Sequence, residues 1–92
     1  MQNTFGIAAY RSRQQVLLLE NALRREGVNA GVITTPREVA LGCGLSVRFS
    51  MEDLEKVQTA VRRLRPASLI GVYRVDSGGG RTHLTPMGKY RS

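Results

Sequence analysis

The residue best suited to chemistry is Cys43, the only cysteine of the chain, which stands between Gly42 and Gly44. Because glycine has no side chain and tolerates positive φ, the backbone around this cysteine leaves its sulfur open to a ligand or a partner protein. Only the thiolate form of cysteine is a nucleophile, and a neighbouring cation lowers the thiol pKa from its usual value of about 8.5. The segment therefore predicts a nucleophilic sulfur wherever a cation lies beside it.

Two arginines are close enough in the sequence to supply that cation. Arg37 directly follows Pro36, and Arg48 comes five positions after Cys43. Pro36 fixes its own φ and lacks an N–H, which predicts that the preceding strand ends there and that a loop leads to Cys43. The alternative is that Cys43 packs as a small apolar residue, since free cysteine is among the most buried residue types. Exposure of the sulfur decides between the two interpretations.

The composition indicates a small globular protein. The chain has 92 residues, of which 41% are hydrophobic and 23% charged, as in ordinary soluble domains. No apolar run approaches the ~18 residues of a membrane span, and the first residues do not have the pattern of a signal peptide. A lone cysteine forms no intramolecular disulfide and no all-cysteine metal site, which favours a reducing compartment. We therefore expect a cytoplasmic protein with no membrane association, no metal and no cofactor.

The basic charge raises the question of nucleic-acid binding. The formal net charge is +7, and residues 77–92 contribute Arg81, Lys89 and Arg91 without any acidic residue. Basic proteins attract polyanions, so RNA is a candidate partner. Against it, aromatic residues make up only 5% of the chain and no RNA-binding aromatic motif is present. The lone histidine, His83, falls in the same glycine-rich stretch and gives no metal site.

Periodicity and capping residues place the elements that must position Cys43. Strands are expected at residues 5–10, 28–34, 45–49 and 69–75, and helices between residues 12 and 26 and between residues 50 and 66. The order β-α-β-β-α-β predicts an α+β, ferredoxin-like split with a four-stranded antiparallel sheet and both helices on one face. We expect one such domain over residues 4–76, followed by a flexible, glycine-rich basic tail over residues 77–92.

This topology puts the loop before Cys43 at the end of the sheet where the first helix begins. Cys43 should then lie near Arg11 and Arg13, beside the positive end of that helix. Such an environment stabilises a thiolate or a bound anion. The candidate site is therefore Cys43 with an anion-stabilising set and Pro36 for the loop geometry. The expected anion-stabilising residues are Arg37, Arg48, Arg11, Arg13, Gly42 and Gly44.

The segment TPREVALGCGLSVRF at residues 35–49 resembles a small bacterial family, the putative selenium/sulfur carrier protein-like family. The resemblance rests on Tyr10 at the end of the first strand, Pro36–Arg37, Cys43–Gly44 and Arg48, and it extends over residues 5–75. It implies a carrier that accepts sulfur or selenium on Cys43 as a persulfide or selenosulfide from a donor protein and passes it to an acceptor. The chain lacks the cysteine–proline motif of other sulfur-relay carriers.

Two other functions are compatible with the sequence. One is a non-catalytic ligand-binding or protein-interaction module with a regulatory role, in which the open sheet face would pair with a second copy to form a homodimer. The other is RNA binding through the basic tail and the arginine-rich helix ends. A stand-alone enzyme is a weaker interpretation. The expected domain has no carboxylate pair in a loop, no histidine to act as a base and no glycine-rich phosphate loop after a strand.

Overall fold

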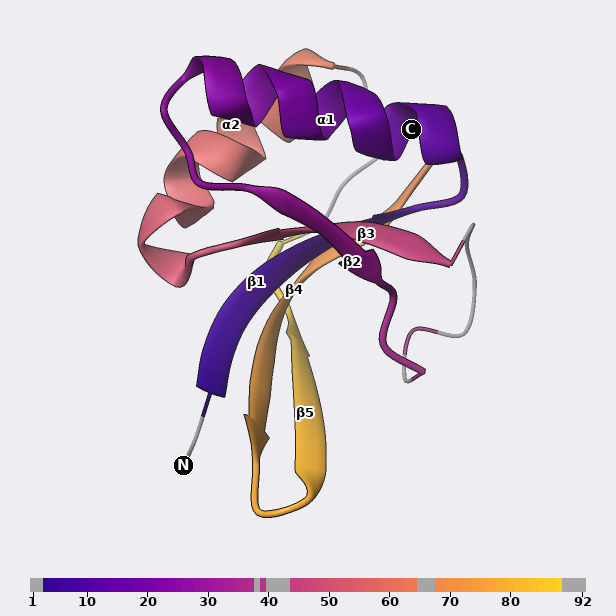
Figure 1. The fold of residues 1–92 in the computed structure, drawn as a ribbon, viewed down its shortest axis with the longest axis vertical. Coiled ribbons are helices and arrows are strands. Elements are labelled where there is room, and N and C mark those ends of the chain that lie inside the picture. Colours follow the sequence, from indigo (N-terminus) through magenta and orange to yellow (C-terminus); the bar gives the residue numbers. More distant parts are fainter. Residues whose placement is uncertain (1–2, 38, 40–43, 65–67, 89–92) are drawn as a thin grey trace.

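The computed structural model describes residues 3–37, 39, 44–64 and 68–88 (Figure 1). In this part of the chain, five strands and two α-helices follow one another, with a short 3-10 turn before the second helix. Their bounds are β1 Asn3–Tyr10, α1 Arg13–Arg25, β2 Gly31–Thr34, β3 Leu45–Phe49, η1 Met51–Asp53, α2 Leu54–Arg63, β4 Leu69–Gly78 and β5 Arg81–Pro86.

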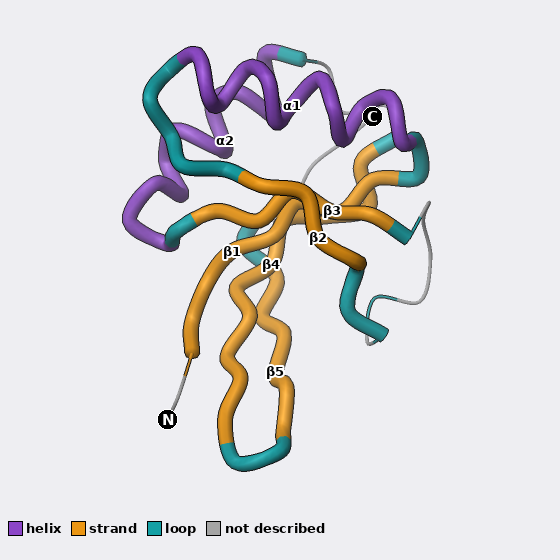
Figure 2. Tube along the Cα trace, viewed as in Figure 1, coloured by secondary structure: helices purple, strands orange, loops and turns teal. Residues whose placement is uncertain are grey.

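The strands form one antiparallel sheet in the order β2-β3-β1-β4-β5. Both helices lie on the same side of this sheet (Figures 1 and 2). The α+β class, the antiparallel sheet and the placement of both helices on one face (Figure 1) are therefore confirmed. The expected four-stranded ferredoxin-like split is corrected to five strands, because β5 extends the sheet beyond β4.

The fifth strand comes from the segment expected to be a flexible tail. β4 continues to Gly78, and β5 pairs with it from Gly78↔Arg81 to Tyr73↔Pro86. Between them, Gly79 and Gly80 have φ of +57° and +78°. Two adjacent residues at positive φ make the tight hairpin turn whose twist matches that of the flanking strands. The run of three glycines is therefore part of a hairpin, and residues 77–86 of the expected flexible tail over residues 77–92 belong to the sheet.

The hairpin of β4 and β5 is attached to the rest of the domain at Met87, directly after β5. The Met87 N–H donates a hydrogen bond of 2.8 Å to the Val72 carbonyl. The Gln58 side chain on α2 donates another, of 3.1 Å, to the Met87 carbonyl. Met87 also packs against the core. The segment after β5 therefore contributes to the contacts that hold α2 against the sheet.

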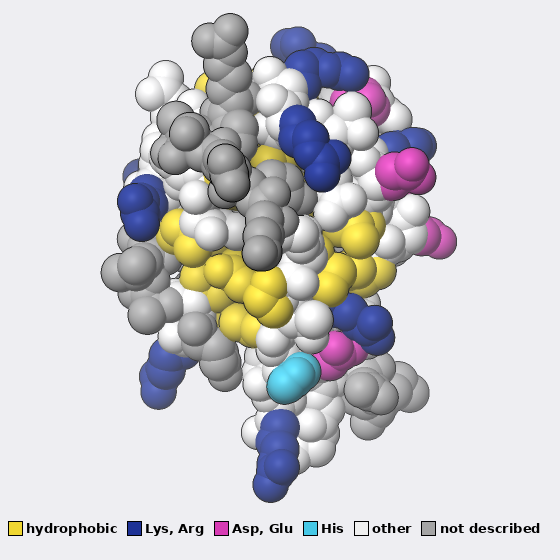
Figure 3. All heavy atoms as spheres, turned by 180° about the vertical axis from the view of Figure 1, so that it is seen from behind, with side chains coloured by type: hydrophobic (Ala, Val, Ile, Leu, Met, Phe, Trp, Pro, Cys, Tyr) yellow, Lys and Arg dark blue, Asp and Glu magenta, His cyan; other side chains and the backbone are white. Residues whose placement is uncertain are grey.

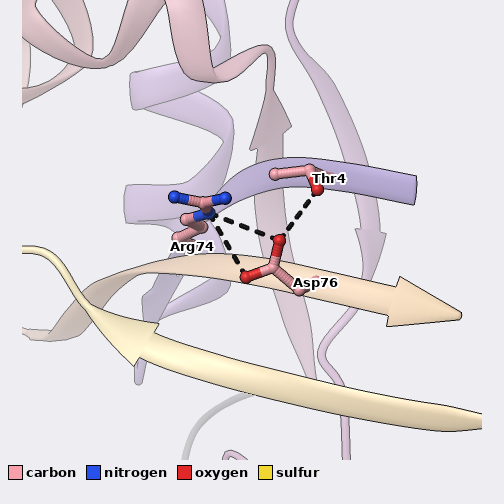
Figure 4. Close-up of polar contacts among 3 residues, drawn as sticks. All are labelled: Thr4, Arg74 and Asp76. Carbon is pink, nitrogen blue, oxygen red and sulfur yellow. Dashed lines mark hydrogen bonds and ion pairs between the residues drawn. The ribbon is translucent and has the colours of Figure 1, made fainter. Parts of the chain in front are cut away.

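A polar cluster connects the start of β1 to the last residues of β4 (Figure 4). The Thr4 hydroxyl donates a hydrogen bond of 2.8 Å to Asp76 Oδ1. The Arg74 Nε lies 3.3 Å from the same oxygen and 3.2 Å from Oδ2. These contacts fix the Asp76 carboxylate between two strands, at the end of the sheet that the helices do not cover (Figures 1 and 4).

The core lies between the helices and one face of the sheet. Ser12 caps α1, where its hydroxyl accepts a hydrogen bond of 3.4 Å from the Gln15 N–H, as the capping pattern predicts. Apolar residues at helical spacing on α1 and α2 face alternate residues of β1, β3 and β4. The buried members are Val16, Leu19, Leu23, Val57, Ala60 and Val61 from the helices and Ala8, Tyr10, Val47, Phe49 and Val72 from the strands.

The hairpin turn gives a stability test. Replacing both Gly79 and Gly80 by alanine places Cβ atoms at positive φ, which costs roughly 1–2 kcal/mol per residue. Reduced freedom of the unfolded chain offsets about half of this. We expect the free energy of unfolding in urea to fall by about 1–2 kcal/mol in total. Gly79→Asn, which tolerates positive φ, is the matched control and should change little. An alanine variant as stable as the parent would show that the hairpin adds nothing to folding.

Candidate functional site

The expected site lies where the chain leaves β2 and enters β3. Cys43 and Gly42 are outside the described residues, so the site is defined by the residues on either side of them. Thr34 pairs with Leu45, and Ser46 pairs with Ala9 near the end of β1. The start of β3 is thus at the same end of the sheet as the exit of β1, which leads directly into α1. Gly44, the residue next to Cys43, therefore lies at the end of the sheet where α1 begins.

Hydrogen bonds hold both sides of this segment. The Thr35 N–H donates a hydrogen bond of 2.9 Å to the Gly44 carbonyl, which continues the β2–β3 pairing by one step. The Val39 N–H donates a hydrogen bond of 2.9 Å to the Pro36 carbonyl and closes a turn that contains Arg37. Gly44 has φ of +85°, a conformation that other residues rarely adopt. Backbone hydrogen bonds and the conformation of Gly44 therefore hold the described residues that flank the segment, which are Thr35, Pro36, Val39 and Gly44.

A buried hydroxyl pair adds a second connection at this point. Thr35 Oγ1 and Ser46 Oγ are 2.7 Å apart, and Ser46 is 0% exposed. In β3, Ser46 is on the opposite face of the strand from Val47 and Phe49, which face the helices. The structure buries it because that face of the sheet is also covered here, as the 0% exposure of Ile7 and Ala9 shows. Sequence reasoning missed the pair. A threonine directly before proline and a serine between apolar residues of a strand each give only a weak signal.

The structure divides the expected cations into two groups. Arg11 and Arg13 are exposed and lie at the end of the sheet that carries Gly44, and Arg37 is exposed in the turn after β2. The Arg11 N–H donates a hydrogen bond of 2.8 Å to the Ser68 carbonyl, which connects this end of the sheet to the start of β4. The Ser68 hydroxyl is buried and has no hydrogen-bond partner in the described part of the chain.

Arg48 does not belong to this group. It pairs with Gly31 and Ile7, further along β3 toward its other end. Its guanidinium lies 4.1 Å from the centre of the Phe5 ring, a cation–π contact. The strand rises about 3.3 Å per residue, so Arg48 is carried away from the start of β3. Arg11, Arg13 and Arg37 therefore lie at the end of the sheet that carries Gly44, whereas Arg48 lies toward the other end of β3.

Other kinds of site have little support in the described residues. They contain no group of three or more His, Cys, Asp and Glu side chains that could hold a metal ion. None of their helices has the length and apolar composition needed to cross a membrane. On the face shown in Figure 3, hydrophobic side chains gather in the middle, and the visible Lys and Arg side chains lie in separate places around them. This face offers no continuous basic patch among the atoms in view.

The hydroxyl pair can be tested by a double-mutant cycle. Thr35→Val keeps the shape of the side chain but leaves the Ser46 hydroxyl buried without its partner, which should lower the free energy of unfolding by about 1–3 kcal/mol. Adding Ser46→Ala removes the unpaired hydroxyl, so the double variant should be more stable than the sum of the single changes predicts. Urea unfolding of the four proteins measures this coupling. Simple additivity would mean that the two hydroxyls do not interact.

Comparison with protein-family models matches residues 5–65 to the family described as "Putative Se/S carrier protein-like". This match covers more than half of the 92 residues, from β1 to just beyond α2. It confirms the resemblance to that family but ends earlier than residue 75, so β4 and β5 fall outside it. Searches of curated proteins and of solved structures give no match. On the strength of the family match, the chain belongs to the putative Se/S carrier protein-like family.

Proposed function

We propose that the protein carries a sulfur or selenium atom on Cys43, as a persulfide or a selenosulfide, between a donor protein and an acceptor protein. The observation that carries this proposal is the family match, which spans the segment containing the only cysteine of the chain. The hydrogen bonds at Thr35 and Val39 support it, because they fix the chain on both sides of that segment.

The transfer needs only one thiolate on the carrier. The Cys43 sulfur attacks the terminal sulfur of a donor persulfide, the donor's sulfur–sulfur bond breaks, and the donor thiolate leaves with the electron pair. No net oxidation occurs. Because the chain has a single cysteine, no second thiol within it can release the carried atom. The persulfide therefore persists until a nucleophile of the acceptor attacks its terminal atom and regenerates the Cys43 thiolate.

The charges at this end of the sheet suit the carried group. Both a cysteine thiolate and a terminal persulfide sulfur are anions, which nearby cations stabilise. Arg11, Arg13 and Arg37 are exposed there, and the N-terminal end of α1 adds a partial positive charge. Gly44 leaves the approach to its side of Cys43 free of a side chain. These features favour a nucleophilic Cys43 over a packed apolar one.

Mass spectrometry tests the carrier function directly. After incubation with a cysteine desulfurase and cysteine, we expect the intact protein to gain the mass of one sulfur atom, located on Cys43 by peptide mapping. Cyanide should remove the added atom as thiocyanate, because it attacks the terminal sulfur of a persulfide. Cys43→Ser is the control and should gain nothing. A parent protein that gains no sulfur under forcing conditions would contradict the proposal.

The pH dependence of alkylation tests the role of the arginines. With iodoacetamide, the folded protein should react at Cys43 with a midpoint below about 8.5, because only the thiolate reacts. Arg37→Gln should move this midpoint upward. Arg48→Gln is the matched control, since it removes the same charge from an exposed residue further from the site. Alkylation that occurs only after unfolding would identify Cys43 as a buried structural residue. Equal midpoints in the parent and Arg37→Gln would remove Arg37 from the site.

A further inference from the structure

A recess of about 630 Å³ lies at the other end of β3 from Gly44. Its wall is formed where β1 and β2 begin and where β3 runs into η1. This volume falls within the range of small-molecule sites, about 300–1,000 Å³. Apart from Ile33, which pairs with Ser46, its lining residues lie toward the end of β3 away from Gly44, and the proposed carrier function gives the recess no role.

The recess carries both signs of charge. Two arginines, Arg24 and Arg48, line it together with two acidic residues, Glu52 and Asp53. Arg24 already has two partners. Its Nε donates a hydrogen bond of 3.1 Å to the Ala30 carbonyl, and its guanidinium forms an ion pair of 3.3 Å with the Glu20 carboxylate. Within the described residues, no ion pair joins Arg48, Glu52 or Asp53 to another side chain. One cation and two carboxylates are thus available to a ligand.

Arg48 is held in a fixed position without losing its capacity for hydrogen bonding. Its guanidinium stacks over the Phe5 ring at 4.1 Å from the ring centre. A guanidinium in this position keeps its N–H donors at the edge, where it can bind a carboxylate with two parallel hydrogen bonds. Phe5 also lines the recess and offers an apolar surface beside that cation.

Gly31 keeps the recess open next to Arg48. The two residues are direct partners across the β2–β3 pairing, and Gly31 also lines the recess. Its backbone does not have positive φ, and a Cβ atom added there would meet nothing within 4 Å. Neither backbone conformation nor packing therefore requires glycine at this position. A glycine within a strand is often found where a ligand approaches the backbone closely.

We propose that this recess binds a small zwitterion of the amino-acid type. The ligand's carboxylate would bind Arg48, its ammonium group would bind Glu52 and Asp53, and its apolar part would lie against Phe5. A polyanion such as phosphate fits less well, because the two carboxylates of the lining would repel it. The proposal goes beyond the carrier function and does not depend on Cys43.

The test uses the full chain carrying Cys43→Ser, so that sulfur chemistry cannot contribute. Backbone amide NMR is followed during titration with L-alanine and with 4-aminobutyrate, which differ in the spacing of the two charges. We expect saturable shifts at Gly31 and at residues 48–53 with at least one of these probes. Propionate and propylamine, which each carry one of the two charges, should bind about tenfold more weakly or worse.

Variants connect the binding to the named residues. Arg48→Gln and Glu52→Gln should each weaken binding by about tenfold or more, because each removes a charge-assisted hydrogen bond. Gly31→Val should abolish binding by filling the space next to Arg48. Arg25→Gln is the matched control, since Arg25 is exposed on α1 and does not line the recess. The proposal is overturned if neither zwitterion produces saturable shifts, if inorganic phosphate binds as well as they do, or if Arg48→Gln binds like the control.

Discussion

The pairing of β3 with β1 sets the geometry of both ends of the molecule. β1 is the central strand, and Ile7, Ala8 and Ala9 are completely buried, so the strand must be apolar on both faces. In the observed register, Val47 and Phe49 of β3 face the helices and are almost fully buried. A slip of one residue would turn Ser46 and Arg48 into the core and take the two apolar side chains out of it. At about 1.5–3 kcal/mol for each large buried side chain, that alternative is excluded.

This register separates two chemically different regions on one strand. The first residues of β3 meet the exits of β1 and β2, where exposed arginines and the start of α1 gather. The last residues of β3 meet the starts of β1 and β2, where the mixed-charge recess lies. Arg48 shows how an extended strand misleads sequence reasoning. It is close to Cys43 in the sequence, yet three residues of β3 beyond Leu45 carry it roughly 10 Å along the strand.

Much of the fold follows from patterns that are local in the sequence. The stripes of α1 and α2 and the cap at Ser12 each depend on a few neighbouring residues, and all are present in the structure. The hairpin was missed because a glycine run fits a linker as well as a tight turn until the flanking strands are paired. The burial of Ser46 was missed because alternation distinguishes the two faces of a strand but does not reveal what covers the second face. The recess was not predictable, since it combines residues far apart in the sequence that each have an ordinary structural role.

The family match ends before β4, whereas the sheet includes β4 and β5. The match ends at residue 65, but β1 pairs with β4 from Asn3↔Ser77 to Tyr10↔Leu69. Without β4, one edge of the central strand would lose its hydrogen-bond partners, and the core would lose Val72. The register of β1 would then be fixed from one side only, by β3. Since the placement of Gly44 and Arg11 at a common end depends on the pairing of β1, the hairpin outside the match helps to position Gly44, the residue next to Cys43.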